Sequence, residues 1–133
     1  FFAFSKEGKT CSCLPLGDID DKQYEQYQLI AVGKVLQLKE EGFGRSIKIH
    51  VESYYKGKTN SDTITIQSPQ DQGLCGLSIK TGEMWLFFGY WDGKEYYTNL
   101  CTRTKNLNPH SAFYNRDAIK KDIAFLERKR KVS

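Results

Sequence analysis

The residues with the clearest capacity for chemistry are the four cysteines of the chain: Cys11, Cys13, Cys75 and Cys101. Positions i and i+2 of an extended strand point to the same face, so Cys11 and Cys13 bond each other only with strain, whereas each can reach a neighbouring segment. An even cysteine count without a Cys-x-x-Cys pair favours disulfides and an oxidising compartment. The alternative is a zinc site, but that needs Cys-x-x-Cys or His-x-x-x-His spacing, and His50 and His110 stand alone. We therefore expect a short, rigid ribbon around Cys11 that could form a working surface.

Catalytic motifs are missing from the sequence. There is no Gly-x-Ser-x-Gly, His-Glu-x-x-His or phosphate-binding loop. Asp18, Asp20 and Asp21 alternate somewhat like calcium ligands but lack the glycine and terminal glutamate of an EF-hand loop, so we interpret them as acids at a helix start. We predict a protein that is not an enzyme and holds no metal and no cofactor.

Length and charge fit a single domain with a small core. The 133 residues carry a net charge of +4, much of it in Arg128-Lys129-Arg130-Lys131. A basic end of this kind is typical of a solvated helix end, and we favour that over a nucleic-acid footprint. No segment reaches the roughly 18 apolar residues of a membrane span, so none is predicted.

The first residues, Phe1-Phe2-Ala3-Phe4-Ser5, resemble the end of a signal-peptide apolar region, with small Ala3 and Ser5 at cleavage-type positions. The alternative is a hydrophobic N-terminal strand. We therefore divide the chain into an N-terminal extension, residues 1–10, which is a signal-peptide remnant or a pro-segment, and a domain of residues 11–133. With the cysteines, this predicts a secreted, periplasmic or cell-surface protein.

The periodicity of the chain indicates mostly strands. A short helix is expected at 22–27, and strands are expected at 29–38, 47–52, 63–66, 84–88 and 95–98. Gly33 inside the first strand suggests a bulge, and Asp92-Gly93 suggests a hairpin turn. A final helix is expected at 114–130, with Asn115 as N-cap and an apolar stripe that covers the barrel. Five short strands and a helix predict a small antiparallel barrel.

The chain resembles the tissue inhibitors of metalloproteinases and the wider netrin-like group in a set of ordered segments: Cys11-Ser12-Cys13-Leu14-Pro15, Ala31-Val32-Gly33-Lys34-Val35, Tyr55-Lys56-Gly57, Cys75-Gly76-Leu77, Thr81-Gly82-Glu83-Met84-Trp85-Leu86-Phe87-Phe88-Gly89 and Leu100-Cys101. They are spread, in this order, over about two thirds of the chain, from residue 11 to 101. The resemblance implies a mainly β fold, a five-stranded OB-fold (Greek-key) barrel with a short N-terminal helix and a C-terminal helix. It also implies Cys11–Cys75 and Cys13–Cys101 disulfides.

The resemblance further implies roles for the ribbon. In those inhibitors the ribbon enters the cleft of a zinc metalloproteinase, where the free α-amine and carbonyl of the first cysteine chelate the zinc. Carried over, Cys11 is the chelator, Ser12 is the pocket residue, and Cys13, Leu14 and Pro15 continue the contact ribbon. Gly73 and Leu74, before Cys75, form the supporting loop. Ten residues precede Cys11 here, and the family's third disulfide in this domain is missing.

Three functions follow as hypotheses. The first is a secreted, non-catalytic, netrin-like module that binds a protein partner. The second is a metalloproteinase inhibitor that uses the ribbon. The third is binding of an oligosaccharide or oligonucleotide on the barrel face, with stacking groups supplied by Tyr54, Tyr55, Tyr96 and Tyr97. Disulfides argue against an intracellular nucleic-acid partner.

Overall fold

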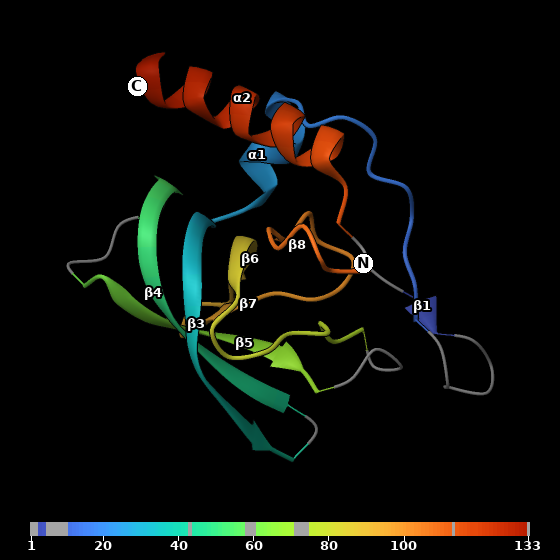
Figure 1. Cartoon of the computed structure of the whole chain (residues 1–133), viewed down its shortest axis with the longest axis vertical. Coiled ribbons are helices and arrows are strands. Elements are labelled where there is room, and N and C mark those ends of the chain that lie inside the picture. The colour runs from blue at the N-terminus through green and yellow to red at the C-terminus, as the bar shows by residue number, and fades with distance from the viewer. Residues whose placement is uncertain are drawn as a thin grey trace.

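Five strands of this chain close into a barrel, as predicted (Figure 1). The structure is a computed structural model that describes residues 3–4, 11–42, 44–57, 61–70, 75–112 and 114–132. Within it the barrel strands are hydrogen-bonded in the order β3-β4-β5-β7-β6, and β6 pairs back with β3. Their bounds are β3 (Leu29–Glu41), β4 (Gly44–Lys56), β5 (Thr63–Pro69), β6 (Met84–Trp91) and β7 (Tyr96–Tyr97). Among the pairs of these described strands, only β5–β7 is parallel, which is the arrangement of an OB-fold barrel.

Strand β3 pairs with β4 on one edge and β6 on the other, and so closes the barrel. Its pairing with β4 shifts register between Val32 and Gly33, which confirms the bulge predicted at this glycine. A Cβ at Gly33 would lie 2.9 Å from Ile49 Cδ1 and 3.0 Å from the His50 carbonyl oxygen. A side chain at position 33 would therefore require Ile49 and the neighbouring backbone of β4 to shift.

Two apolar clusters explain the pattern of the strands. The barrel interior holds one cluster: Leu29, Ala31, Val35, Ile47, Ile49, Val51, Ile66, Leu77, Ile79, Trp85 and Phe87. The other lies on the outside of β3 and β6, beneath the helices: Ile19, Tyr27, Ile30, Leu86, Phe88 and Leu126. Strands β3 and β6 contact the barrel interior on one face and the cluster beneath the helices on the other, so both contain continuous runs of apolar residues. Strand β4 is covered only on its inner face here and alternates, with Ile47, Ile49 and Val51 inward, as predicted.

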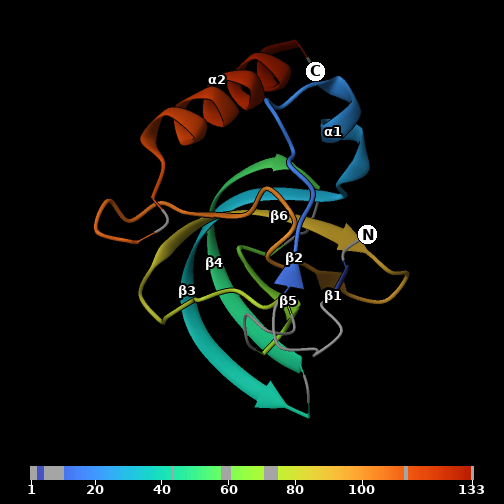
Figure 2. The same ribbon diagram turned by 90° about the vertical axis from the view of Figure 1, so that its right-hand side faces the viewer.

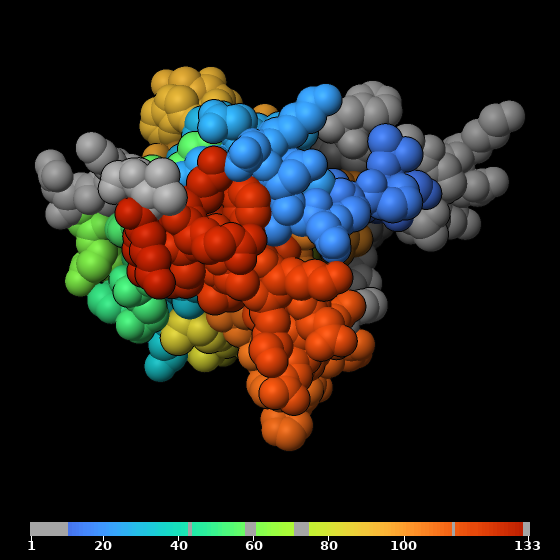
Figure 3. All heavy atoms as spheres, turned by 90° about the horizontal axis from the view of Figure 1, so that it is seen from above, coloured from blue at the N-terminus to red at the C-terminus, as the bar shows by residue number. Residues whose placement is uncertain are grey.

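Both predicted helices are present. Helix α1 (Asp21–Gln26) begins after Asp20, whose Oδ1 accepts a 2.9 Å hydrogen bond from the Gln23 amide. Helix α2 (Arg116–Val132) begins after the predicted cap Asn115, whose Oδ1 accepts from the Ala118 amide at 3.1 Å. The two helices lie side by side and cover one face of the molecule (Figure 3). Among the described residues, no helix is long and apolar enough to cross a membrane.

Three further strands are very short: two of them lie where an N-terminal strand was the alternative and where the cysteine ribbon was expected, and the third, Lys105–Asn106, was not predicted. Strands β1 (Ala3–Phe4) and β2 (Cys11–Ser12) form a separate antiparallel pair beside the barrel. Strand β8 (Lys105–Asn106) adds to the free edge of β6. The segment that follows β2 crosses the outside of the barrel toward the helices (Figure 2). This places the cysteine ribbon on the surface, between barrel and helices.

Candidate interaction site at the cysteine ribbon

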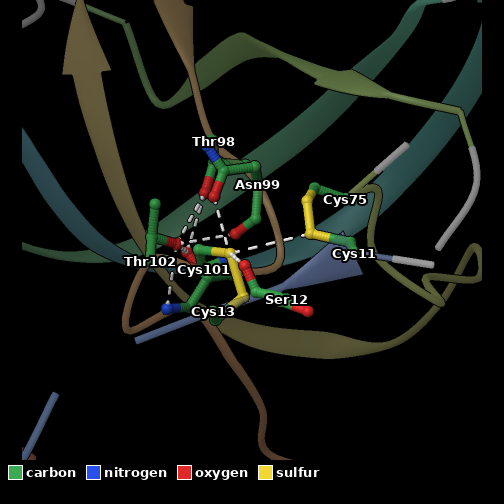
Figure 4. The surroundings of a disulfide bond; sticks show 9 residues. Cys11, Ser12, Cys13, Cys75, Thr98, Asn99, Cys101 and Thr102 are labelled. Carbon is green, nitrogen blue, oxygen red and sulfur yellow. Dashed lines mark hydrogen bonds between the residues drawn. A yellow bond between two sulfur atoms is a disulfide. The ribbon is translucent and has the colours of Figure 1, made fainter. Parts of the chain in front are cut away.

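Two disulfides hold the ribbon on the barrel. Cys11 is bonded to Cys75 and Cys13 to Cys101, the pairing that the resemblance implies, with Cα atoms 5.2 Å apart in each pair (Figure 4). The bonds join positions 64 and 88 residues apart in sequence. They converge on one place, because Cys11 Sγ lies 3.8 Å from Cys101 Sγ. All four cysteines are consumed in disulfides, so the sulfur cluster offers no thiolate to a zinc ion in this state.

The loop that carries Cys101 is anchored by buried hydroxyl groups. The Oγ1 atoms of Thr98, Thr102 and Thr104 lie within 3.0 Å of one another. Asn99 adds a side-chain contact, because its Oδ1 accepts a 2.8 Å hydrogen bond from the Cys101 amide. Thr98 is fully buried, and Asn99 and Thr102 are each only 6% exposed. This hydrogen-bond network holds the Cys101 loop in place, and the Cys13–Cys101 disulfide fixes the ribbon to that loop.

Cys75 supplies the second anchor from the opposite side. Its side chain is fully buried, and its carbonyl accepts a 2.7 Å hydrogen bond from the Leu100 amide. Its backbone has φ +66°, a left-handed conformation that costs a non-glycine residue about 1 kcal/mol. The predicted supporting residues before it, Gly73 and Leu74, lie outside the described part of the chain. The anchor that can be described is thus Cys75 and its contact with the Leu100 amide.

The ribbon exposes its apolar side chains instead of burying them. Leu14 is 75% exposed, and Ser12, Cys13 and Pro15 are exposed as well. Leu16 and Leu100 are 38% and 39% exposed, and both line the same hollow of 310 Å³ as Leu14 and the Cys13–Cys101 bond. We call Leu14, Leu16 and Leu100 the ribbon patch. Of these three leucines, the sequence had singled out only Leu14.

Two described residues of the N-terminal extension, Ala3 and Phe4, pair with the ribbon. Strand β1 pairs with β2 in antiparallel register, with Ala3 opposite Ser12 and Phe4 opposite Cys11. One backbone edge of Cys11-Ser12 is therefore occupied by the same chain. The nitrogen of Cys11 is also an amide, because Thr10 precedes it. In this form Cys11 has no free amine with which to chelate a metal ion.

A buried arginine fixes the end of the ribbon, and sequence reasoning missed it. Arg103 Nη1 donates to the Gly17 carbonyl at 2.9 Å and to Gln23 Oε1 at 2.6 Å. Its Nη2 donates to Asp122 Oδ1 on α2 at 2.8 Å. Lys105 pairs with the other oxygen of Asp122 at 2.8 Å, and burial lowers the pKa of Lys105 although Asp122 acts in the opposite direction. One arginine thus joins the ribbon, α1 and α2.

Comparison with known proteins does not extend the resemblance. No protein-family model matches the chain, and no curated protein matches its sequence. The resemblance therefore remains an expectation from the ordered motifs, and the arrangement of the site is interpreted from its own geometry.

Proposed function

We propose that this chain is a non-catalytic, netrin-like protein-binding module that works outside the cytoplasm and meets its partner through the ribbon patch. The single observation that carries the proposal is the exposure of Leu14, which is 75% exposed although two disulfides fix the segment beside it. A large apolar side chain held rigidly in solvent contributes to folding no more than a polar one would. On binding it can bury its surface at little entropic cost.

The composition of the ribbon patch supports this use. Three partly or fully exposed leucines surround one shallow hollow, and the disulfide between Cys13 and Cys101 forms part of its wall. Clustered apolar groups on a protein surface mark interaction sites more often than single exposed ones do. The disulfides also favour an oxidising compartment, which supports a secreted, periplasmic or cell-surface location.

Site-specific crosslinking tests the proposal. A photoreactive residue is placed at position 14 of the oxidised protein, and the matched control carries it at position 36, because Leu36 is also an exposed leucine (45%) but lies on β3. Each labelled protein is mixed with the extracellular protein fraction of the source cells and then irradiated. We expect a defined crosslinked protein from position 14 only. Excess unlabelled protein should compete with it, and a Leu14→Ser variant should not. Equal crosslinking from both positions, or competition by Leu14→Ser, would reject the ribbon patch as the contact.

Metalloproteinase inhibition is the second candidate. It is favoured by the two disulfides, which occur in the implied pairing and leave Ser12 exposed between them. Zinc chelation requires a free α-amine at Cys11, however, and this chain has Thr10 and strand β1 in that place. The inhibitor proposal therefore applies to a form of the protein that begins at Cys11.

Its test compares two forms of the oxidised protein, the whole chain and a chain that begins at Cys11, against a panel of zinc metalloproteinases. We expect inhibition only from the shorter form. A version of the shorter form with an acetylated α-amine serves as control and should be inactive. If the acetylated version inhibits equally well, chelation by Cys11 is wrong, whereas the binding-module proposal is unaffected.

A further inference from the structure

The two tryptophans of this chain have opposite environments. Trp85 is 5% exposed inside the barrel, and its Nε1 donates to Glu83 Oε1 at 3.1 Å. Trp91, at the end of β6, is 47% exposed, and Tyr97 nearby is 39% exposed. The rings of Trp91 and Tyr96 meet edge to face with centroids 4.9 Å apart. An exposed aromatic cluster therefore lies at the β6–β7 turn, which projects from the edge of the barrel (Figure 2).

The position of Trp91 is fixed by its surroundings. Its amide donates to Gln28 Oε1 at 3.0 Å. The turn that follows is capped by Asp92, whose Oδ1 accepts hydrogen bonds from the amides of Lys94 and Glu95 at 2.9 and 2.8 Å. Because both ends of the turn are held, the indole is presented without a large loss of entropy when a ligand packs on it.

A hollow of 490 Å³ opens between β5 and this turn, within the size range of small-molecule sites. Its lining is Ile64, Thr65, Gln67, Trp91, Lys94, Glu95 and Tyr96. The described lining carries one basic and one acidic side chain, so its net charge is zero. A phosphate or sulfate polymer needs an excess of positive charge and is poorly matched to it. Aromatic rings beside hydroxyl and amide groups instead suit an uncharged ligand rich in hydroxyls.

We propose that this hollow binds a neutral oligosaccharide. Trp91 packs against the apolar face of a sugar ring, and Gln67 and Thr65 exchange hydrogen bonds with its hydroxyl groups. The position of the hollow agrees with that of the ligand sites in other OB barrels. These bind oligosaccharides and oligonucleotides near the third strand and the loop between the fourth and fifth strands. In this chain these are β5 and the β6–β7 turn.

Of the four tyrosines expected from the sequence as stacking groups, only Tyr96 lines this hollow. The Tyr55 hydroxyl donates to Glu127 Oε2 on α2 at 2.8 Å, and the Arg130 guanidinium lies 4.2 Å from the centre of its ring. The Tyr54 hydroxyl donates to the Ser61 carbonyl at 3.0 Å. Both tyrosines are thus engaged elsewhere. Tyr96 remains as a lining residue of the hollow, and the exposed tryptophan takes the leading role.

The site shares no lining residue with the hollow at the ribbon patch, so the two proposals fail independently. The experiment titrates the oxidised full chain with cellotetraose, chitotetraose and mannotetraose by calorimetry and by tryptophan fluorescence. We expect at least one of the three sugars to bind and to change the emission of the wild type. The Trp91→Ala variant should bind that sugar about tenfold more weakly.

Two variants are matched to that substitution. Trp91→Phe keeps an aromatic face, so it should retain binding within a few fold while losing the emission change, because the remaining Trp85 is buried. Leu14→Ser, at the ribbon patch, should bind sugar as the wild type does. Unfolding midpoints in urea check that each variant is folded. The proposal is overturned if none of the sugars binds at millimolar concentration, if Trp91→Ala binds unchanged, or if only a thymidine tetranucleotide or a heparin tetrasaccharide binds through Trp91.

Discussion

Arg103 and Asp122 form an ion pair at 2.8 Å between side chains that are only 5% and 1% exposed. They lie 19 residues apart, one after the Cys101 loop and the other in the middle of α2. Asp122 also faces Lys105, whose side chain is 21% exposed, at 2.8 Å, so one buried carboxylate serves two cations. This small network joins the helical layer to the loop that carries a disulfide.

Replacing Asp122 by Asn should therefore destabilise the protein strongly. The buried Arg103 and the partly exposed Lys105 would lose their counter-charge, and removal of one partner from a buried pair typically costs about 3–5 kcal/mol. The measurement is the free energy of unfolding in urea. Asp18→Asn is the matched control, because Asp18 pairs with Lys121 at 3.5 Å with side chains 78% and 64% exposed, and it should cost about 0–1 kcal/mol. If Asp122→Asn lost as little stability as the Asp18→Asn control, the buried network would contribute little to the stability of the protein.

Replacing Gly33 by Ala tests the close approach at the bulge of β3. The new Cβ would lie 2.9 Å from Ile49 Cδ1 and 3.0 Å from a backbone oxygen that cannot move freely. We expect a loss of about 1–3 kcal/mol in the free energy of unfolding. Gly44→Ala is the control on β4, where the nearest atom to a Cβ is 3.6 Å away. If the Gly44 variant lost as much stability as the Gly33 variant, crowding at Gly33 would not be the cause of the loss.

Replacing both Cys13 and Cys101 by Ser should lower stability by about 4 kcal/mol at most, because the bond restrains a long loop in the unfolded chain. The matched variant replaces Cys11 and Cys75. Loop entropy grows only with the logarithm of length, so separations of 88 and 64 residues should give nearly equal losses. Thermal and urea unfolding of the two double variants measure this. A clear inequality would point to native contacts of one disulfide.

The turn at Asp92 gives a pH dependence of known sign. Hydrogen bonds from the amides of Glu95 and Lys94 lower the pKa of the Asp92 carboxyl below its ordinary 3.8. Since the pKa is lower in the folded state, the stabilisation is present above about pH 4 and is lost as pH falls through the folded-state value. Asp92→Asn should therefore be less stable than the wild type at pH 7, and the gap in urea midpoint should narrow in acid. A gap that widens in acid contradicts this account.

The sequence predicts the barrel well because its strands carry clear physical signals. Residues 47–52 alternate on a strand with one buried face, and Gly33 interrupts a β-branched run where the pairing with β4 shifts register. Asn115 and the apolar stripe behind it predict α2 within two residues of its bounds. In each case the sequence pattern lies within the element that it predicts, so it can be recognised without knowing which distant residues pack against that element.

The rest of the site could not be predicted, because its determinants are long-range. Arg103 and Asp122 look like surface charges in the sequence, and nothing near either residue indicates a buried partner. Strands of two residues, such as β2 and β8, have no periodicity to detect. Leu100 lines the same hollow as Leu14, a residue 86 positions earlier, and no local pattern indicates that the two meet. The ribbon itself was predictable, because the spacing of Cys11 and Cys13 indicates that each forms a disulfide with a distant cysteine.

The convergence of the two disulfides has a mechanical consequence. Cys11 Sγ and Cys101 Sγ are 3.8 Å apart, so the ribbon is fastened at almost a single point to two separate loops of the barrel. A partner that pulls on the ribbon transmits its force through covalent bonds into the loops at Cys75 and Cys101. The hydrogen bonds between the strands receive this force only through these two loops. Force applied to the ribbon is therefore shared between two loops of the barrel instead of one.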